Sequence, residues 1–207
     1  MKQLDKCVYE VPIITHGNIC DVKNIHNAVI KAQKRIVNFV AEHNLAVSLE
    51  IPFLNAVRVY EKQINFIKAL RKTEFLDASF KLPKTISAIV VNKTLMIISP
   101  KAYTKIYPIE GLEKDGYEKL ISHEIAHELH IKILNGNEDH MGPKWFYEGF
   151  AIIAADQFKN ATVSKERFWE IIKYEINTSY KEYSAVIRRL IHKFPLKVLV
   201  KKAHEKD

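Results

Sequence analysis

The stretch from Gly116 to His130, GYEKLISHEIAHELH, constrains the fold of this chain most strongly. Its pattern is helical, and an α-helix places residues four apart on the same face, so His123 and His127 point the same way. Two neutral imidazoles so placed can occupy two corners of a tetrahedral zinc site, with Glu124 beside them. The stretch therefore predicts a helix with two metal ligands and a base, or else an ordinary solvated helical face.

A catalytic zinc site needs a third protein ligand, and the later stretch PKWFYEGFA offers Glu148. Twenty residues separate His127 from Glu148, enough for one helix to end and a second to present a carboxylate to the first. Gly149 allows another backbone or side chain to approach closely. The alternative for Glu148 is an acidic residue near a helix N-terminus, where the helix dipole favours it.

Other residues near these two stretches are either alternative ligands or part of the core. Three loop residues are candidate ligands only if Glu148 is not one: Glu138, Asp139 and His140. Three aromatic residues are interpreted as part of the core: Trp145, Phe146 and Phe150.

HEIAH followed by WFYEGFA resembles the gluzincin metallopeptidases, the thermolysin-like and aminopeptidase-like group, which carry HExxH and a later Glu in a context like WxxEGxA. The similarity covers roughly residues 116–192. It implies that His123, His127 and Glu148 hold one Zn²⁺ per chain, and that Glu124 is the catalytic base of peptide-bond hydrolysis.

The same resemblance implies a tyrosine that donates a hydrogen bond to the oxyanion of the reaction. In aminopeptidase-like members this tyrosine opens a helix downstream of the Glu ligand, and NTSYKEYSAVIRRLIHKF is similar to that region. Aligning the apolar pattern through Leu190 puts Tyr180 at the donor position, with Tyr183 as the fallback. Either tyrosine is alternatively a packed aromatic on an amphipathic helix.

The sequence departs from related patterns at several positions. The metzincin pattern HExxHxxGxxH is excluded, because its glycine position holds His130 and its last histidine position Ile133. No GxMEN-like stretch occurs in residues 80–115, which favours an endopeptidase over an aminopeptidase. Thermolysin-like enzymes place an Asp four residues after the Glu ligand, where this chain has Ile152. His130 and Asp156 are the remaining candidates for residues that contact the zinc ligands and hold them in orientation.

Periodicity predicts the other elements. A helix is expected over 22–44 after Asp21, and another after Pro52, ending near Lys72. TISAIVV and TLMIIS predict a hairpin with a two-residue turn, and TLMIIS is a candidate sheet edge for binding an extended peptide. Further helices are expected at about 117–134, 145–158, 164–177 and 179–193, followed by a short last helix.

These elements predict an α+β protein. The resemblance implies a zincin-like metallopeptidase fold, with a small mixed sheet and the active-site helix in the N-terminal lobe and a helical C-terminal lobe. We expect residues 1–110 to form an N-terminal helical segment plus the sheet and 111–207 the zinc-binding helical region, together one compact catalytic unit. The segment YPIEGLEKDG, with a Pro and two Gly, marks the boundary.

Composition limits the partners. The net charge of +8 comes from 32 Lys and Arg spread along the chain against 24 Asp and Glu, without a nucleic-acid motif, so no nucleic-acid partner is expected. Neither a membrane span nor a signal peptide is visible, which predicts a cytoplasmic protein, or a secreted one if a leader has been trimmed. The expected partner is a peptide or protein substrate.

Together these features predict zinc-dependent peptide-bond hydrolysis by a metal-activated water, in an endopeptidase. Two alternatives stay open. One is a zincin-fold peptide-binding or regulatory protein without turnover, and the other is an intracellular metallopeptidase that cleaves repressors.

Overall fold

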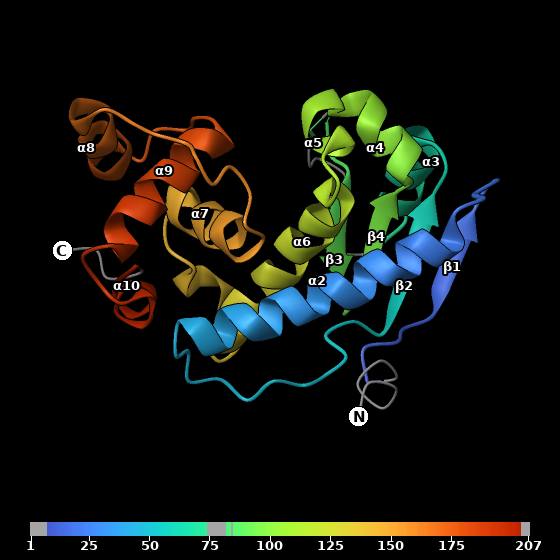
Figure 1. The fold of residues 1–207 in the computed structure, drawn as a ribbon, viewed down its shortest axis with the longest axis horizontal. Helices are drawn as coiled ribbons and strands as arrows, with labels where there is room; N and C mark the ends of the chain where they lie inside the picture. Colours follow the sequence, from blue (N-terminus) through green and yellow to red (C-terminus); the bar gives the residue numbers. More distant parts are fainter. Residues whose placement is uncertain (1–7, 74–81, 84, 204–207) are drawn as a thin grey trace. The chain divides into compact units, whose positions relative to one another are not determined.

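The computed structural model describes residues 8–73, 82–83 and 85–203, and Figure 1 shows its helices and strands. The elements in chain order are β1 Ile13–His16, α2 Val22–Glu42, β2 Ala56–Tyr60, α3 Gln63–Leu70, β3 Ala88–Val91, β4 Thr94–Ile98, α4 Pro100–Ile106, α5 Pro108–Leu112, α6 Gly116–Ile133, the 3₁₀ turn η1 Glu138–His140, α7 Lys144–Ala154, α8 Lys165–Tyr174, α9 Tyr180–Ile191 and α10 Leu196–Lys202.

The chain forms two compact units. The sheet unit comprises residues 1–34 and 50–124, and the helical unit comprises 35–49 and 125–207. The division passes through α2 and through α6, whereas the boundary expected near residue 110 lies inside the sheet unit. No helix in the described part of the chain has the length and apolar composition needed to cross a membrane.

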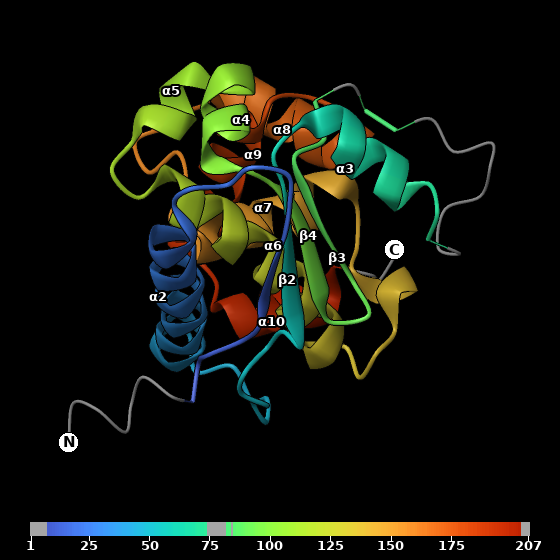
Figure 2. The ribbon, with the colours of Figure 1, turned by 90° about the vertical axis from the view of Figure 1, so that its right-hand side faces the viewer.

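The sheet unit contains a small mixed sheet of four strands in the order β1-β2-β4-β3. Strands β1, β2 and β4 run parallel to one another, and β3 pairs with β4 in the antiparallel direction. Figure 2 shows β2, β4 and β3 side by side. Parallel neighbours need a crossover connection, which α2 supplies between β1 and β2. A small mixed sheet together with helices is compatible with the predicted α+β class.

The predicted hairpin is confirmed, with a two-residue turn between β3 and β4. Val91 pairs with Thr94, and the two turn residues, Asn92 and Lys93, have φ angles of 48° and 56°. Positive φ at both central residues matches the right-handed twist of hairpin strands. Asparagine adopts this conformation more readily than most residues.

The prediction that TLMIIS lies at a sheet edge is wrong. Strand β4 pairs with β2 on one side and β3 on the other, and its residues Leu95 to Ile98 are all buried. A continuous apolar run is typical of a strand covered on both faces. The edges of this sheet are β1 and β3.

The prediction of a helix directly after Pro52 is also wrong for the first half of that segment. Residues 56–60 form β2, and the helix α3 begins only at Gln63. Val57 and Val59 are buried on a strand that pairs on both sides, while Arg58 between them is exposed. This period-two pattern and the tertiary pairing outweigh the helical spacing of the apolar residues. Strand β1 was not expected from the sequence.

Two contacts fix the beginning of α6 in the sheet unit. The Tyr117 hydroxyl, in the first turn, donates a 2.8 Å hydrogen bond to the carbonyl of Ile98 at the end of β4. A Cβ atom on Gly116 would lie only 1.8 Å from the Glu110 carbonyl oxygen, so the helix must start at a residue without a side chain. The helix that carries HEIAH is therefore anchored to the sheet at its N-terminus.

The helical unit is built around the packing of α7 against α9, which Figure 1 shows as neighbouring helices. The two helices approach closely at Gly149, where an added Cβ would lie 3.2 Å from Cβ of Ile187 and 3.4 Å from the carbonyl oxygen of Tyr183. The close approach predicted at Gly149 is thus confirmed. The helices expected in the second half are present, each within a few residues of its predicted bounds.

A buried histidine lies in the aromatic core of the helical unit. His130 on α6 is fully buried, stacks on Phe150 with ring centroids 4.4 Å apart, and contacts the edge of Phe146. Neither of its ring nitrogens has a hydrogen-bond partner among the described residues. Burial lowers the pKa of His130 from 6.5 to about 4, because the charged form loses its hydration.

We expect the burial of His130 to make the protein less stable in mild acid. Between pH 6.5 and pH 4 the unfolded chain binds a proton that the folded chain excludes, so stability falls as the pH drops through this range, by up to roughly 3 kcal/mol from this group. His130→Leu should remove this part of the pH dependence without lowering stability at pH 7. Urea unfolding at pH 7 and pH 5 measures both, with exposed His192→Leu as the control. An unchanged pH dependence in His130→Leu would contradict the assignment.

We expect Gly149→Val to destabilise the helical unit by about 1–3 kcal/mol, because the new methyl groups overlap Ile187 in a closely packed contact. Valine has a higher helix propensity than glycine, so propensity alone would favour the variant and a loss of stability must come from packing. Lys144→Val, at an exposed position of the same helix, controls for the introduction of a valine into α7. Chemical unfolding of the three proteins measures the difference. Equal midpoints for the two variants would show that the close packing at Gly149 contributes nothing.

Candidate metal centre

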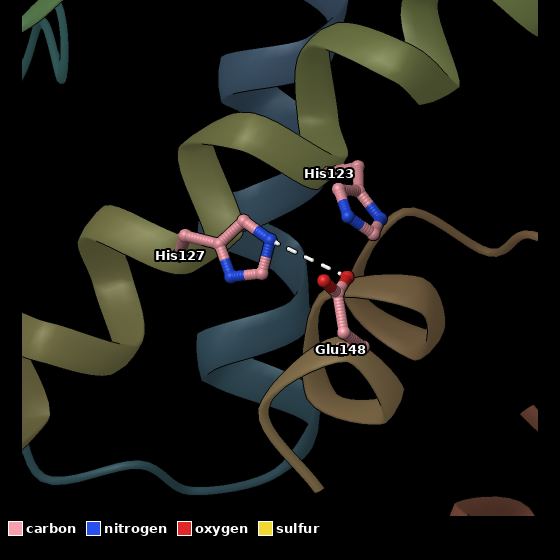
Figure 3. Close-up of side chains that lie close together, drawn as sticks. All are labelled: His123, His127 and Glu148. Carbon is pink, nitrogen blue, oxygen red and sulfur yellow. Dashed lines mark ion pairs between the residues drawn. The ribbon is translucent and has the colours of Figure 1, made fainter. Parts of the chain in front are cut away.

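Three side chains from α6 and α7 form a cluster that suits a metal ion. His123 and His127 lie one turn apart on α6, and Glu148 lies on α7. One nitrogen from each histidine and one oxygen of Glu148 all lie within 4.8 Å of one another. Figure 3 shows the two imidazoles and the carboxylate turned toward each other. The structure thus brings together the three residues predicted as metal ligands.

The three donor groups are of types that bind zinc. Ligand atoms at 2.0–2.2 Å from a tetrahedral Zn²⁺ are about 3.3–3.6 Å apart. Nε2 of His127 lies 3.7 Å from Oε2 of Glu148, which is close to this spacing and too long for a good hydrogen bond. Two imidazoles and one carboxylate also suit several transition metals, so the cluster could hold a metal ion without its identity being fixed by the donor set.

Burial argues against the two simpler interpretations of these residues. His123 is only 5% exposed, so HEIAH is not a solvated helical face. Glu148 is 8% exposed and is the fifth residue of α7, beyond the first turn in which the helix dipole is effective. A buried carboxylate is unfavourable unless it is paired, hydrogen-bonded or bound to a metal.

The loop residues do not form a competing site. Glu138, Asp139 and His140 lie in η1 and are exposed. In the part of the chain that the structure describes, the cluster of His123, His127 and Glu148 is the only group of this kind.

Glu124, the predicted base, follows His123 on α6 and is half-buried. One residue along an α-helix corresponds to a rotation of about 100°, so its carboxylate leaves the helix beside the face that carries the two histidines. This position is the one expected of a carboxylate that acts next to a metal without binding it.

His130 and Asp156, the two residues expected to orient the zinc ligands, make contacts with other residues. His130 stacks on Phe150 in the core. Asp156 forms ion pairs with Arg188 on α9, at 3.5 Å, and with Lys159, at 3.8 Å. It follows Glu148 by eight residues, roughly 12 Å along a helix axis. These contacts give no support to either residue as a partner of the ligands.

The two candidate donor tyrosines differ in environment. Tyr180 is the first residue of α9 and is 41% exposed. Tyr183 is fully buried, and its hydroxyl accepts a 3.0 Å hydrogen bond from the Thr178 backbone N–H and lies 3.2 Å from Oδ1 of Asn177. The Tyr183 hydroxyl therefore holds the loop before α9, whereas Tyr180 stands at the helix start that the resemblance implies.

The structure adds one residue that the sequence did not single out. Tyr147, next to Glu148 on α7, places its ring edge-to-face with the imidazole of His127, with centroids 6.1 Å apart. Burial raises the pKa of Tyr147, with smaller effects from Glu148 and Tyr183. Its position immediately before the predicted third ligand was the only signal in the sequence.

Comparisons with known proteins supply no further identification. No protein-family model, no curated protein and no solved structure matches this chain. The cluster on α6 and α7 and the motifs that carry it are therefore the basis for inferring what the protein does.

Proposed function

We propose that this protein is a zinc-dependent metallopeptidase of gluzincin type that acts as an endopeptidase on peptide or protein substrates. The observation that carries the proposal is the convergence of His123, His127 and Glu148 within 4.8 Å. Two of them come from HEIAH and the third from WFYEGFA, which are the two motifs of that group. The mixed sheet and α6 are compatible with the zincin-like fold that the proposal implies.

In this proposal the three ligands leave one position of the ion for water. Bound zinc would act as a Lewis acid and lower the pKa of water to about 7. His123 and Glu148 are buried and His127 is half-buried, so the side chains that bind the ion are largely withdrawn from bulk solvent. Low exposure strengthens the electrostatic effect of groups around the reacting atoms.

Glu124 would serve as general base and then as general acid. A carboxylate beside the two histidines can take a proton from the attacking water and later deliver it to the leaving amine. Because Glu124 is not one of the three clustered ligands, its replacement separates proton transfer from metal binding.

Tyr180 would donate a hydrogen bond to the oxyanion. Its exposure at the start of α9 leaves the side chain accessible to a substrate. The hydroxyl of Tyr183 already holds the loop before α9, which makes Tyr183 the weaker candidate.

The alternatives share the same metal site and differ in turnover. A peptide-binding or regulatory protein would keep the ligands without needing Glu124 as a base. A repressor-cleaving intracellular metallopeptidase would use the same chemistry on a narrower substrate. The presence of Glu124 beside the ligands favours turnover over a binding role.

We expect one zinc per chain in the wild-type protein and in Glu124→Gln, and loss of zinc in Glu148→Ala, because Glu148 binds the ion and Glu124 does not. Cleavage of casein or of quenched peptides should require both residues. Elemental analysis for zinc, iron, copper and nickel on the same samples as the cleavage assay measures both properties. Glu138→Ala, at an exposed loop carboxylate, is the control and should behave like wild type.

The pattern across these proteins separates the possibilities. Zinc without cleavage in the wild type would favour the binding role or a narrow specificity. A different metal would contradict zinc, and no metal after reconstitution would contradict the whole proposal.

We expect Tyr180→Phe to keep its zinc and to lower kcat by about 10²- to 10³-fold, as removal of one oxyanion donor does elsewhere. Tyr174→Phe, at an exposed tyrosine on α8, is the matched control and should leave kcat unchanged. Steady-state kinetics on one peptide measures both. Wild-type turnover in Tyr180→Phe would end the assignment.

A further inference from the structure

His127 is the least buried of the three clustered side chains and therefore depends most on its neighbours for orientation. Its side chain is 24% exposed, against 11% for that of Glu148. The last torsion of a histidine side chain has a broad energy profile, so the ring rotates easily unless something packs against it. A ligand must nevertheless aim one nitrogen at the ion, because coordination is directional.

Helix α7 presents two consecutive side chains to this imidazole. Oε2 of Glu148 lies 3.7 Å from Nε2 of His127. The Tyr147 ring lies beside the same imidazole, with centroids 6.1 Å apart and planes inclined at 63°. This is an edge-to-face arrangement within the favourable range for aromatic pairs. His127 is thus bounded by a carboxylate and by an aromatic ring from one helical segment.

The Tyr147 ring is itself held in place. Its side chain is half-buried, which limits its own motion. The next two residues are Glu148 and Gly149, and Gly149 packs closely on Ile187 of α9. The backbone that carries Tyr147 is therefore part of the most extensive contact between helices in the described part of the helical unit.

We propose that Tyr147 is a positioning residue of the metal centre, whose ring holds the His127 imidazole in the orientation that faces His123 and Glu148. The inference rests on the proposed function, because it assigns Tyr147 a role toward the metal. It requires the ring alone, since the contact is between ring faces and edges. Phenylalanine should replace Tyr147, whereas an aliphatic side chain should not.

Zinc affinity of the full-length protein tests this role directly. Zn²⁺ binding is measured by competition with a chromogenic chelator for wild type, Tyr147→Leu and Tyr147→Phe. Loss of one aromatic contact should weaken Zn²⁺ binding by Tyr147→Leu by about 3- to 10-fold, and Tyr147→Phe should bind like wild type. Tyr174→Leu, the same change at an exposed tyrosine of the helical unit, should also bind like wild type.

A spectroscopic readout separates orientation from general stability. The absorption spectrum of bound Co²⁺ reports the geometry of the ligands, so it should change in Tyr147→Leu and stay the same in Tyr147→Phe and Tyr174→Leu. Circular dichroism and urea unfolding of the metal-free proteins establish that each variant is folded. If Tyr147→Leu does not fold, Tyr147→Met takes its place, because the flexible methionine side chain fills irregular spaces.

The outcomes separate this inference from the proposed function. Wild type that binds no zinc overturns the proposed function and this inference with it. Wild type that binds zinc, together with a folded Tyr147→Leu of equal affinity and unchanged Co²⁺ spectrum, overturns the positioning role alone. Equal weakening in Tyr147→Leu and Tyr147→Phe also overturns it, because the effect would then come from the hydroxyl.

Discussion

Bringing two imidazoles and a carboxylate, largely withdrawn from water, within 4.8 Å of one another is the constraint on which the rest of the site depends. Withdrawing such polar groups from water is unfavourable unless they are paired, hydrogen-bonded or bound to a metal. The fold therefore has to compensate for the unfavourable loss of hydration of the three groups. It does so with two anchored helices: α6 starts on the sheet through Tyr117, and α7 packs on α9 at Gly149.

His127 and His130 lie one helical turn apart on α6 but have different environments, one next to a carboxylate and one in the apolar core. Three residues along an α-helix leave two side chains about 60° apart. His127 faces Glu148 and remains partly exposed, whereas His130 is fully buried against Phe146 and Phe150. The same residue type thus serves as a candidate ligand at one position and as a neutral core side chain at the other.

The aromatic residues around Glu148 contribute to the site in different ways. Trp145, Phe146 and Phe150 are buried, as the sequence predicted, and stabilise the helical unit. Tyr147 lies between them in the sequence but contacts His127 instead. On α7, therefore, Trp145, Phe146 and Phe150 pack the core whereas Tyr147 and Glu148 lie next to His127, because each step along the helix rotates the side chain by about 100°.

The sequence by itself determined those elements that depend mainly on local signals. The long helix α2, the hairpin of β3 and β4, and the helices α6 and α7 follow from periodicity and turn residues. The clustered ligands followed from the spacing of HEIAH and from the motif around Glu148. Only the tertiary structure decided that residues 56–60 are a strand and that β4 is central, because strand pairing depends on partners far away in the chain. It also decided that His130 is buried and that Tyr147 meets His127, since a helical sequence specifies a direction for each side chain but not what will pack against it.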